Sequence, residues 1–588
     1  MNQTSDASNI SPPLSPAARV LWTVLIIATL YLCYFHNLGA IGLVGPDEPR
    51  YAWIARDMAE TGDWVTPRLY GSPWFEKPPL YYWGAALSFK IFGVSEAAAR
   101  LPSAVCALLA TLAMAWLAWR VYTAETARWV LLLLPTTVAM IGFSHTAATD
   151  MPFAAMLTVA MVFAAKLVNV IPPPASGGNS LFSFTSLTSL TSFCLGVFLG
   201  LAALAKGPAA LILSGGGVLL WAAITKRWRD AFRCLHPVAI ASFCLTALPW
   251  YILCAHRNPD FFRVFIIEHN FKRFLTPEFQ HIQPFWYYLP ILLAAIFPWT
   301  LLLGCAGISA AIRCWQERQL YVTPAATFCC CWAVFCLLFF SISQSKLPGY
   351  ILPTIPAVGF CLARSMSASQ MGTARARVFS LLLTSFVDAV LALALAKNWV
   401  HLSRRLLNYQ EAFVILFWAL GLMFLLLAVS FLKRIGTLFA FSSHLAAFAV
   451  FLFFIAALTS NRFAESYGIY KYSTRDLSGA LTNTGVGPQN LRLVHLRRSP
   501  QYQLNFYFHT DLKEWDGQAR AGEFLVGESI TCASLKLGSS CKDLWRERDK
   551  IDDWKLLQIS EPNLPSGFGG VGGNGGSIGG NLDKGKPR

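Results

Sequence analysis

Long apolar runs recur along this chain from residue 18 to residue 458, and they constrain its fold more than any other feature. A membrane-spanning helix needs about 20 mainly apolar residues, and most of these runs approach that length. Charged residues make up only 13% of the 588-residue chain, against about 25% in soluble domains. The pattern predicts a polytopic α-helical membrane protein with about 13 transmembrane helices. The predicted spans are 18–36, 102–119, 129–144, 151–169, 193–205, 208–224, 236–254, 285–305, 322–341, 349–363, 378–396, 411–431 and 437–458.

The Lys and Arg residues of the short loops define one side of the membrane. Such residues favour the cytoplasm, and this bias explains the net charge of +16 without a nucleic acid partner. The rule places the N-terminal tail, residues 1–17, in the cytoplasm. Counting the stretch 79–93 as a span would invert every later loop, so we expect an interfacial helix there. The residues that fix this topology are Arg120, Arg128, Lys226, Arg227, Arg229, Arg233, Arg313, Arg318, Arg364, Arg375, Arg377, Lys433 and Arg434.

The opposite side receives the first loop, 37–101, and everything after the transmembrane domain, 18–459. Residues 460–562 contain the strand-like runs NLRLVHL and QLNFYFH, which predict a small soluble α/β domain. Residues 563–588 are Gly-rich and are expected to be disordered. Cys532 and Cys541 either form a disulfide outside the cytoplasm or remain free thiols.

Ionisable residues gather on this external side. The first loop contains Asp47 and Arg50 in GPDEPRY, followed by Glu76 and Lys77, while Asp150 lies at a helix mouth in SHTAATDMP. Each single Lys or Arg also has a simpler explanation as an interface anchor, because a long side chain reaches water from a helix end. Carboxylates are less suited to anchoring, so the two Asp residues favour a functional role.

Cations and carboxylates together point to a lipid-linked phosphosugar. Arg and Lys suit a phosphate. Further candidates to bind it are Lys346 and Tyr350 in SKLPGYILP and Arg273 in EHNFKRF. Carboxylates suit a sugar hydroxyl, an amine, a metal ion or a proton. Glu48 stays undecided between a functional role and bracing the turn between the two prolines beside it.

Nucleotide-binding motifs are absent from the sequence. There is no glycine-rich phosphate loop of the Walker type and no dinucleotide fingerprint, which argues against ATP-driven transport and a nucleotide-sugar donor site.

The chain resembles the lipid A aminoarabinose transferases, which are polytopic GT-C glycosyltransferases related to the protein O-mannosyltransferases. The resemblance covers roughly residues 18–465, and the Gly-rich end departs from the family pattern. The motifs that carry it are GPDEPRYAWIARDM, GDWVTPRLYGSPWFEKPPLYYW, ATDMP, LAKGP, EHNFKRF and SKLPGYILP.

This resemblance implies a multi-pass enzyme of the bacterial inner membrane, with its active site and C-terminal domain in the periplasm. The donor would be undecaprenyl phosphate-linked 4-amino-4-deoxy-L-arabinose and the acceptor a lipid A phosphate. Modification of that phosphate would give resistance to polymyxin and other cationic peptides. We expect a monomer with no evident cofactor, apart from a possible divalent metal.

The family's site residues map onto this sequence by motif. Asp47 and Asp150 match the essential acidic pair, and Arg50 matches a first-loop arginine. Three residues match the groups that hold the carrier phosphate, and Glu76 matches a residue near a bound divalent metal. The phosphate-binding set is Lys77, Arg273 and Tyr350, of which Arg273 has the neighbours Arg263 and Lys272 as competitors for the match.

Two other functions stay open. A GT-C enzyme of this kind could instead modify protein hydroxyls or another glycan. A lipid-phosphosugar transporter would show internal repeats and polar residues near the bilayer midplane, whereas the charges here gather on one face. The sequence fixes neither the sugar, nor the acceptor phosphate, nor a metal requirement.

Overall fold

The chain folds into two compact units in a computed structural model. The first unit comprises Met1–Arg475 and Tyr502–Tyr507, and the second comprises Asp476–Gln501 and Phe508–Arg588. The structure describes residues 16–171, 181–272, 282–297, 299–300, 303–304, 323–366, 473–528, 530–537, 540–546 and 554–560. The predicted spans at 378–396, 411–431 and 437–458 and the Gly-rich tail lie outside these residues.

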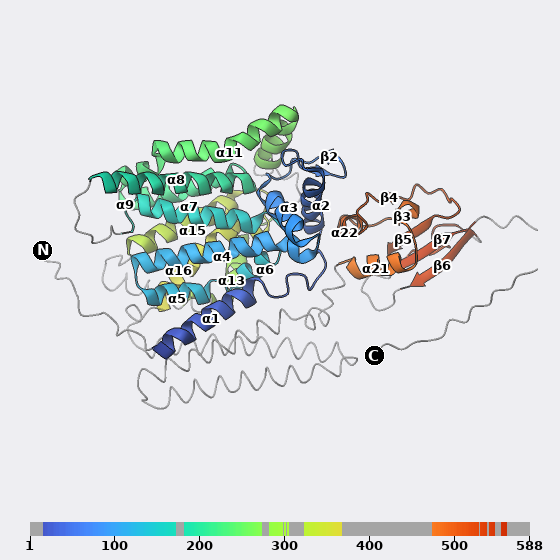
Figure 1. Ribbon diagram of the computed structural model, residues 1–588, viewed down its shortest axis with the longest axis horizontal. Helices are drawn as coiled ribbons and strands as arrows, with labels where there is room; N and C mark the ends of the chain where they lie inside the picture. The colour runs from blue at the N-terminus through green and yellow to red at the C-terminus, as the bar shows by residue number, and fades with distance from the viewer. Residues whose placement is uncertain are drawn as a thin grey trace, which may run out of the picture. The chain divides into compact units, whose positions relative to one another are not determined.

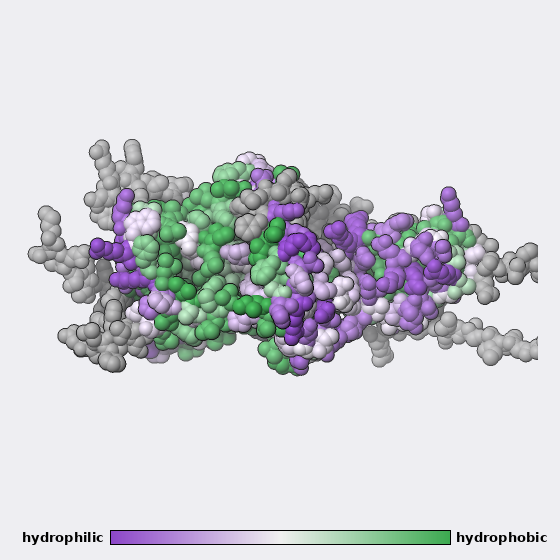
Figure 2. Space-filling model, turned by 90° about the horizontal axis from the view of Figure 1, so that it is seen from above, coloured by the Kyte–Doolittle hydropathy of each residue, from purple (hydrophilic) through white to green (hydrophobic). Residues whose placement is uncertain are grey.

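The first unit is a bundle of long apolar helices (Figure 1). Within the described residues, five helices are long and apolar enough to span a membrane, or six if one bent pair forms a single span. Hydrophobic surface covers this bundle, and hydrophilic surface bounds it (Figure 2). The chain is therefore an integral membrane protein, and the count of about 13 spans stays a prediction. The five helices are α4 (Glu96–Val121), α7 (Asp150–Leu167), α8 (Leu181–Lys206), α11 (Pro237–Arg257) and α15 (Pro324–Ile342).

Helix α7 forms the centre of the bundle. In its most apolar 18-residue stretch, 83% of the residues are buried, against 28% in the corresponding stretch of α11. Helix α7 packs against α4 and α8. Small residues such as Ala154, Ala155 and Ala160 let the neighbouring helices approach closely. Asp150, the first residue of this central helix, is thereby fixed at one end of the bundle.

Three predicted spans differ from single straight helices. The stretch 285–305 begins as the 3-10 turn η4 (Phe285–Tyr287) and continues as α13 (Tyr288–Ile296), which ends where Phe297 leaves the helical conformation. The stretch 129–144 forms α5 (Ala124–Leu133) and α6 (Val138–Ser144), bent by 63°. Pro135 lies in the break and lacks the N–H that would continue the helix. The stretch 349–363 begins as a 3-10 turn, η5 (Pro348–Thr354), before α16 (Ile355–Met366).

Shorter elements surround these helices. A helix occupies 80–92 as expected, and its 13 residues are too few to span; its orientation along the membrane stays a prediction. The remaining elements of this unit are α1 (Pro16–Tyr34), α2 (Asp47–Thr61), β1 (Arg68–Leu69), β2 (Ser72–Pro73), α3 (Leu80–Phe92), α9 (Ala209–Thr225), α10 (Trp228–Ala231), η1 (Phe232–Leu235), the π-helix η2 (Arg263–Lys272), η4 (Phe285–Tyr287) and α13 (Tyr288–Ile296).

The second unit contains a five-stranded mixed sheet in the order β4-β3-β5-β7-β6. Strand β3 pairs in parallel with β4 and β5, and β7 pairs antiparallel with β5 and β6. Cys532 and Cys541 form a disulfide. The strands are β3 (Leu491–Val494), β4 (Lys513–Glu514), β5 (Phe524–Glu528), β6 (Cys541–Arg546) and β7 (Trp554–Ile559), with η8 (Pro488–Asn490) before β3 and α21 (Arg475–Asn483) before η8.

The strand predicted from QLNFYFH is wrong, whereas NLRLVHL contains β3. QLNFYFH lies mostly in a helix, α22 (Arg498–Phe508), of which Tyr502–Tyr507 belongs to the first unit. Gln503 accepts a hydrogen bond from the Thr474 N–H at 2.9 Å, and Phe506 packs beside Tyr51 and Tyr81. These tertiary contacts outweigh the β propensity of an alternating run.

Candidate active site

The first cluster of candidate residues is built at the start of α2. Asp47 begins the helix, and Arg50, one turn later, forms an ion pair with it. Arg50 also lies 3.2 Å from a carboxylate oxygen of Glu76, which follows the β1–β2 hairpin. The guanidinium stacks over the rings of Trp74 and Tyr502 at 5.3 and 5.7 Å. The structure thus brings three predicted site residues into contact.

Burial and the neighbouring charges set the protonation states in this cluster. Burial alone would lower the pKa of Arg50, but the nearby carboxylates of Glu76 and Asp47 outweigh it and raise that pKa above its ordinary value. Burial raises the pKa of Tyr51 and Tyr82 well above the usual range, with Glu76 adding to the effect. Arg50 therefore stays charged and both phenols stay neutral at physiological pH.

A second cluster forms where α7 begins and α8 ends. The Lys206 ammonium donates to an Asp150 carboxylate oxygen at 2.5 Å, and it lies 4.8 Å from the centre of the Tyr350 ring. Gly349 permits this approach, because a Cβ there would lie 3.2 Å from the Asp150 carboxylate and 2.9 Å from Phe143. Asp150 and Tyr350 were both predicted site residues, and Lys206 completes their cluster.

The remaining predicted cations have separate positions. Lys77 is half-buried between β2 and α3. Lys346 is buried, and its ammonium donates to the Ser343 carbonyl at 2.5 Å. Burial lowers the pKa of Lys346. Arg273 lies outside the described residues.

The contacts of Glu48 answer the question of its role, which the sequence left open. Its carboxylate accepts a hydrogen bond from the Val44 N–H at 2.7 Å, so it does brace the turn at the start of α2. It also pairs with Arg100 of α4 at 2.7 Å, and both side chains are buried. No local motif marks Arg100, which in the sequence resembles an ordinary charged residue beside an apolar run. Its one signal is its place beside Pro102, just before a predicted span.

Two cavities lie beside these clusters. One, of about 530 Å³, is lined by Trp74, Glu76, Arg257 and Arg263 among others. The other, of about 400 Å³, is apolar and is lined by residues that include Phe143, Thr146, Pro348 and Ile351. A cavity with charged groups in its lining and a mainly apolar cavity suit a ligand with both characters.

Known proteins resemble this chain in sequence. A family model described as dolichyl-phosphate-mannose-protein mannosyltransferase matches residues 20–265. An undecaprenyl phosphate-alpha-4-amino-4-deoxy-L-arabinose arabinosyl transferase of Enterobacter sp. (strain 638) is 30% identical over 410 residues, which cover 68% of this chain and 70% of that protein. A protein of the same name from Edwardsiella ictaluri (strain 93-146) is 33% identical over 344 residues, or 58% of each chain.

The chain belongs to the undecaprenyl phosphate-aminoarabinose arabinosyl transferase family.

A solved structure of the same family shares the fold. The crystal structure of ArnT from Cupriavidus metallidurans bound to undecaprenyl phosphate has a TM-score of 0.73 and 23% identity, covering 92% of this chain and 98% of that one. The apo structure of the same transferase gives a TM-score of 0.72. The GT-C fold predicted from the sequence is confirmed.

The described residues around Glu76 do not suit the divalent metal that the resemblance allowed. The Arg50 guanidinium already lies 3.2 Å from the Glu76 carboxylate, and a second cation there would be repelled. Within the described part of the chain, no three His, Cys, Asp or Glu side chains gather as a ligand set. No catalytic step is therefore assigned to a metal.

Proposed function

We propose that this protein transfers 4-amino-4-deoxy-L-arabinose from undecaprenyl phosphate to a phosphate of lipid A. The family membership supports the reaction type. One structural observation carries the site: Glu48 binds the N–H of Ala147 at 2.7 Å and so joins the segment of Asp47 to the segment of Asp150. The two carboxylates that the reaction needs thus come from segments held against each other.

The reaction is a displacement at the anomeric carbon of the sugar. A lipid A phosphate oxygen forms the new bond to that carbon, and the bond from the carbon to the carrier phosphate breaks. The acceptor phosphate is already anionic, so it needs little general-base catalysis. Asp47 and Asp150 instead bind the ammonium and hydroxyl groups of the sugar, or stabilise the positive charge that builds on the anomeric carbon.

Fixed cations stabilise the departing carrier phosphate. Negative charge grows on its oxygens as the bond breaks, and positioned cations lower the barrier without rearranging. Lys77, Lys346 and Arg273, with the Tyr350 hydroxyl, fill this role, and Lys206 adds a cation beside Tyr350. The apolar cavity that includes Phe143 and Pro348 offers a place for the first polyprenyl units.

Transfer takes place at the periplasmic face of the inner membrane. The positive-inside rule places the first loop and the helix mouth at Asp150 on the side away from the cytoplasmic Lys and Arg clusters. The sugar covers an anionic phosphate and adds an ammonium group, which weakens the attraction of polymyxin and similar cationic peptides.

Mass spectrometry of lipid A tests the assignment. Lipid A from cells with the gene should carry one aminopentose that is absent from cells without it. Asp47→Asn and Lys77→Ala should each abolish the shift while the protein still inserts into the membrane. Unmodified lipid A in cells with the wild-type gene, or modified lipid A with either variant, would contradict the proposal.

A second acceptor class is favoured by the match to the mannosyltransferase model over residues 20–265. A protein hydroxyl is a weaker nucleophile than a phosphate, so Asp47 or Asp150 would then act as the general base. In that case the lipid A mass stays unchanged, and glycopeptides of periplasmic proteins gain the sugar.

A further inference from the structure

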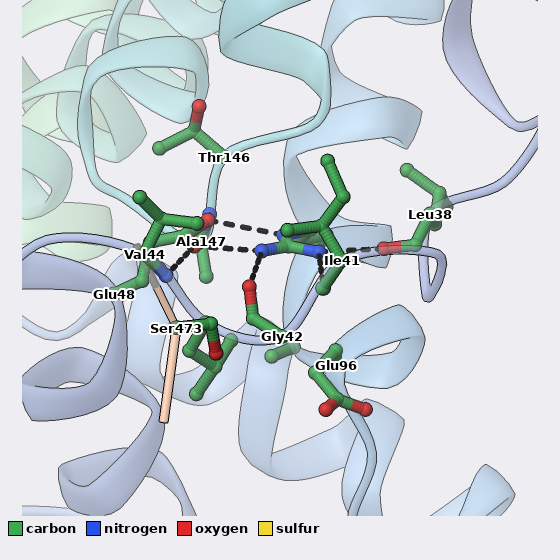
Figure 3. A network of polar contacts seen from close by, with 12 residues as sticks. Leu38, Ile41, Gly42, Val44, Glu48, Glu96, Thr146, Ala147 and Ser473 are labelled. Atoms are coloured by element: carbon green, nitrogen blue, oxygen red, sulfur yellow. Dashed lines mark hydrogen bonds and ion pairs between the residues drawn. The ribbon is translucent and has the colours of Figure 1, made fainter. Parts of the chain in front are cut away.

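The Glu48–Arg100 ion pair is the most completely bonded polar group of the site region. The Arg100 guanidinium donates to both carboxylate oxygens of Glu48, at 3.1 and 2.7 Å. It also donates to the carbonyls of Leu38, Ile41 and Gly42, at 2.9, 2.7 and 3.0 Å (Figure 3). Only the planar fork of an arginine can meet such a set of acceptors at once.

Glu48 distributes its two oxygens between two backbone segments. One oxygen accepts from the Val44 N–H and the other from the Ala147 N–H, both at 2.7 Å. The second segment is held again by Ser103 of α4, whose hydroxyl donates to the Thr146 carbonyl at 2.7 Å. These contacts tie together the start of the first loop, the start of α2 and the turn before α7.

Two of those segments lead to the proposed catalytic carboxylates. Asp47 immediately precedes Glu48, and Asp150, the first residue of α7, lies three residues after Ala147. Neither Glu48 nor Arg100 lines the cavities at the site, and both side chains are about 5% exposed. Neither can reach a substrate, so any effect on the reaction must pass through the segments that they hold.

We propose that Glu48 and Arg100 are positioning residues that set the separation of Asp47 and Asp150 around the donor sugar. This inference rests on the proposed function for the roles of the two Asp residues. A buried ion pair is a poor source of net stability, because desolvation offsets most of its attraction. Its fixed geometry suits positioning, since a displacement of about 1 Å in a reacting group can lower the rate about 10²-fold.

Two readouts on the purified full chain test this proposal. Hydrogen exchange measures the protection of the Ala147 amide and its neighbours at 145–149, and steady-state kinetics separate kcat from KM for the donor. The variants are Glu48→Gln and Arg100→Lys. Tyr34→Phe is the matched control, because it removes a buried 2.7 Å hydrogen bond between α1 and α4 that touches no site segment.

Glu48→Gln should accelerate exchange at 145–149 by about tenfold and leave α7 protected. Its kcat should fall by about 10- to 100-fold while KM changes by less than about threefold, because the substrate contacts remain. Arg100→Lys keeps the charge and the Glu48–Ala147 bond, so both effects should be smaller. The control should lose stability without either change.

A normal kcat per folded molecule in Glu48→Gln overturns the proposal, whether or not exchange rises. If that variant does not fold, Ser103→Ala decides, because it loosens the same turn and leaves the ion pair intact; unchanged exchange and kcat there also overturn it. Failure of the wild type to transfer any sugar would instead refute the proposed function, and the exchange result would still report whether Glu48 holds the turn.

Discussion

The Glu48–Arg100 and Asp150–Lys206 ion pairs join the same kinds of group and differ in their surroundings. The first pair has side chains only 5% and 6% exposed, whereas those of the second are 13% and 24% exposed. Arg100 binds three backbone carbonyls besides its partner. Lys206 instead faces Asp150 and the Tyr350 ring at the ends of two helices. The buried pair organises backbone, and the less buried pair places its charges at the ends of two helices, where the proposed substrate would bind.

The largest expected difference between the pairs is in stability. Glu48→Ala leaves Arg100 charged and buried without its partner, which should lower the free energy of unfolding by about 3–5 kcal/mol. The adjacent Asp47→Ala removes a carboxylate that is 56% exposed, and it should cost less than about 1 kcal/mol. Thermal unfolding of the two variants in the same detergent measures the contrast. Equal losses would mean that the burial difference has no energetic consequence.

The Asp150–Lys206 pair should show the opposite pattern, with a large effect on kcat and a small one on stability. Asp150→Asn keeps the shape of the side chain and removes its charge, so kcat should fall about 10²- to 10³-fold. The melting temperature should change less than in Glu48→Ala, because the Asp150–Lys206 pair is less buried and water screens its charges more. Kinetics and thermal unfolding on one preparation test both parts. An unfolded Asp150→Asn protein would place Asp150 with the structural pair.

The site residues predicted from the sequence all come from short local motifs. Asp47 and Arg50 lie in GPDEPRY, Asp150 in ATDMP and Tyr350 in SKLPGYILP, and the structure groups them as two clusters. The membrane class also followed from the sequence, since apolar runs of spanning length leave few alternatives, whereas the GT-C fold was implied by the resemblance of the motifs to a known family.

The buried pair was missed because its chemistry depends on contacts distant in sequence. Arg100 meets Glu48 52 positions earlier, and Glu48 meets Ala147 99 positions later. The aromatic partner Tyr502 of Arg50 likewise comes from the far end of the chain, in α22. Local patterns give periodicity and turns but no such pairings, so a residue whose function is to join segments looks like any charged residue at a helix end.

A smaller effect on kcat is expected for Lys206, the cation of the Asp150–Lys206 pair. Lys206→Met removes the cation beside Asp150 and Tyr350, and kcat should fall about 10- to 100-fold, as for loss of one charged hydrogen bond. Lys206→Arg keeps the charge in a larger group and should retain more activity. If Lys206 serves only to neutralise Asp150, the double variant Asp150→Asn/Lys206→Met should match Asp150→Asn alone.

The smallest expected effect concerns pH and Lys346. Burial lowers the pKa of this ammonium, so as pH rises it loses its proton before an ordinary lysine does. The neutral amine binds a phosphate less well, and the affinity for undecaprenyl phosphate should fall about fivefold across that range. The free energy of unfolding should rise over the same range, because the unfolded state then binds more protons than the folded state.

Lys346→Arg stays charged, so its affinity should remain flat and its stability should not show this rise. Parallel titrations of affinity in the two proteins measure the effect, and identical curves would remove Lys346 from the phosphate site.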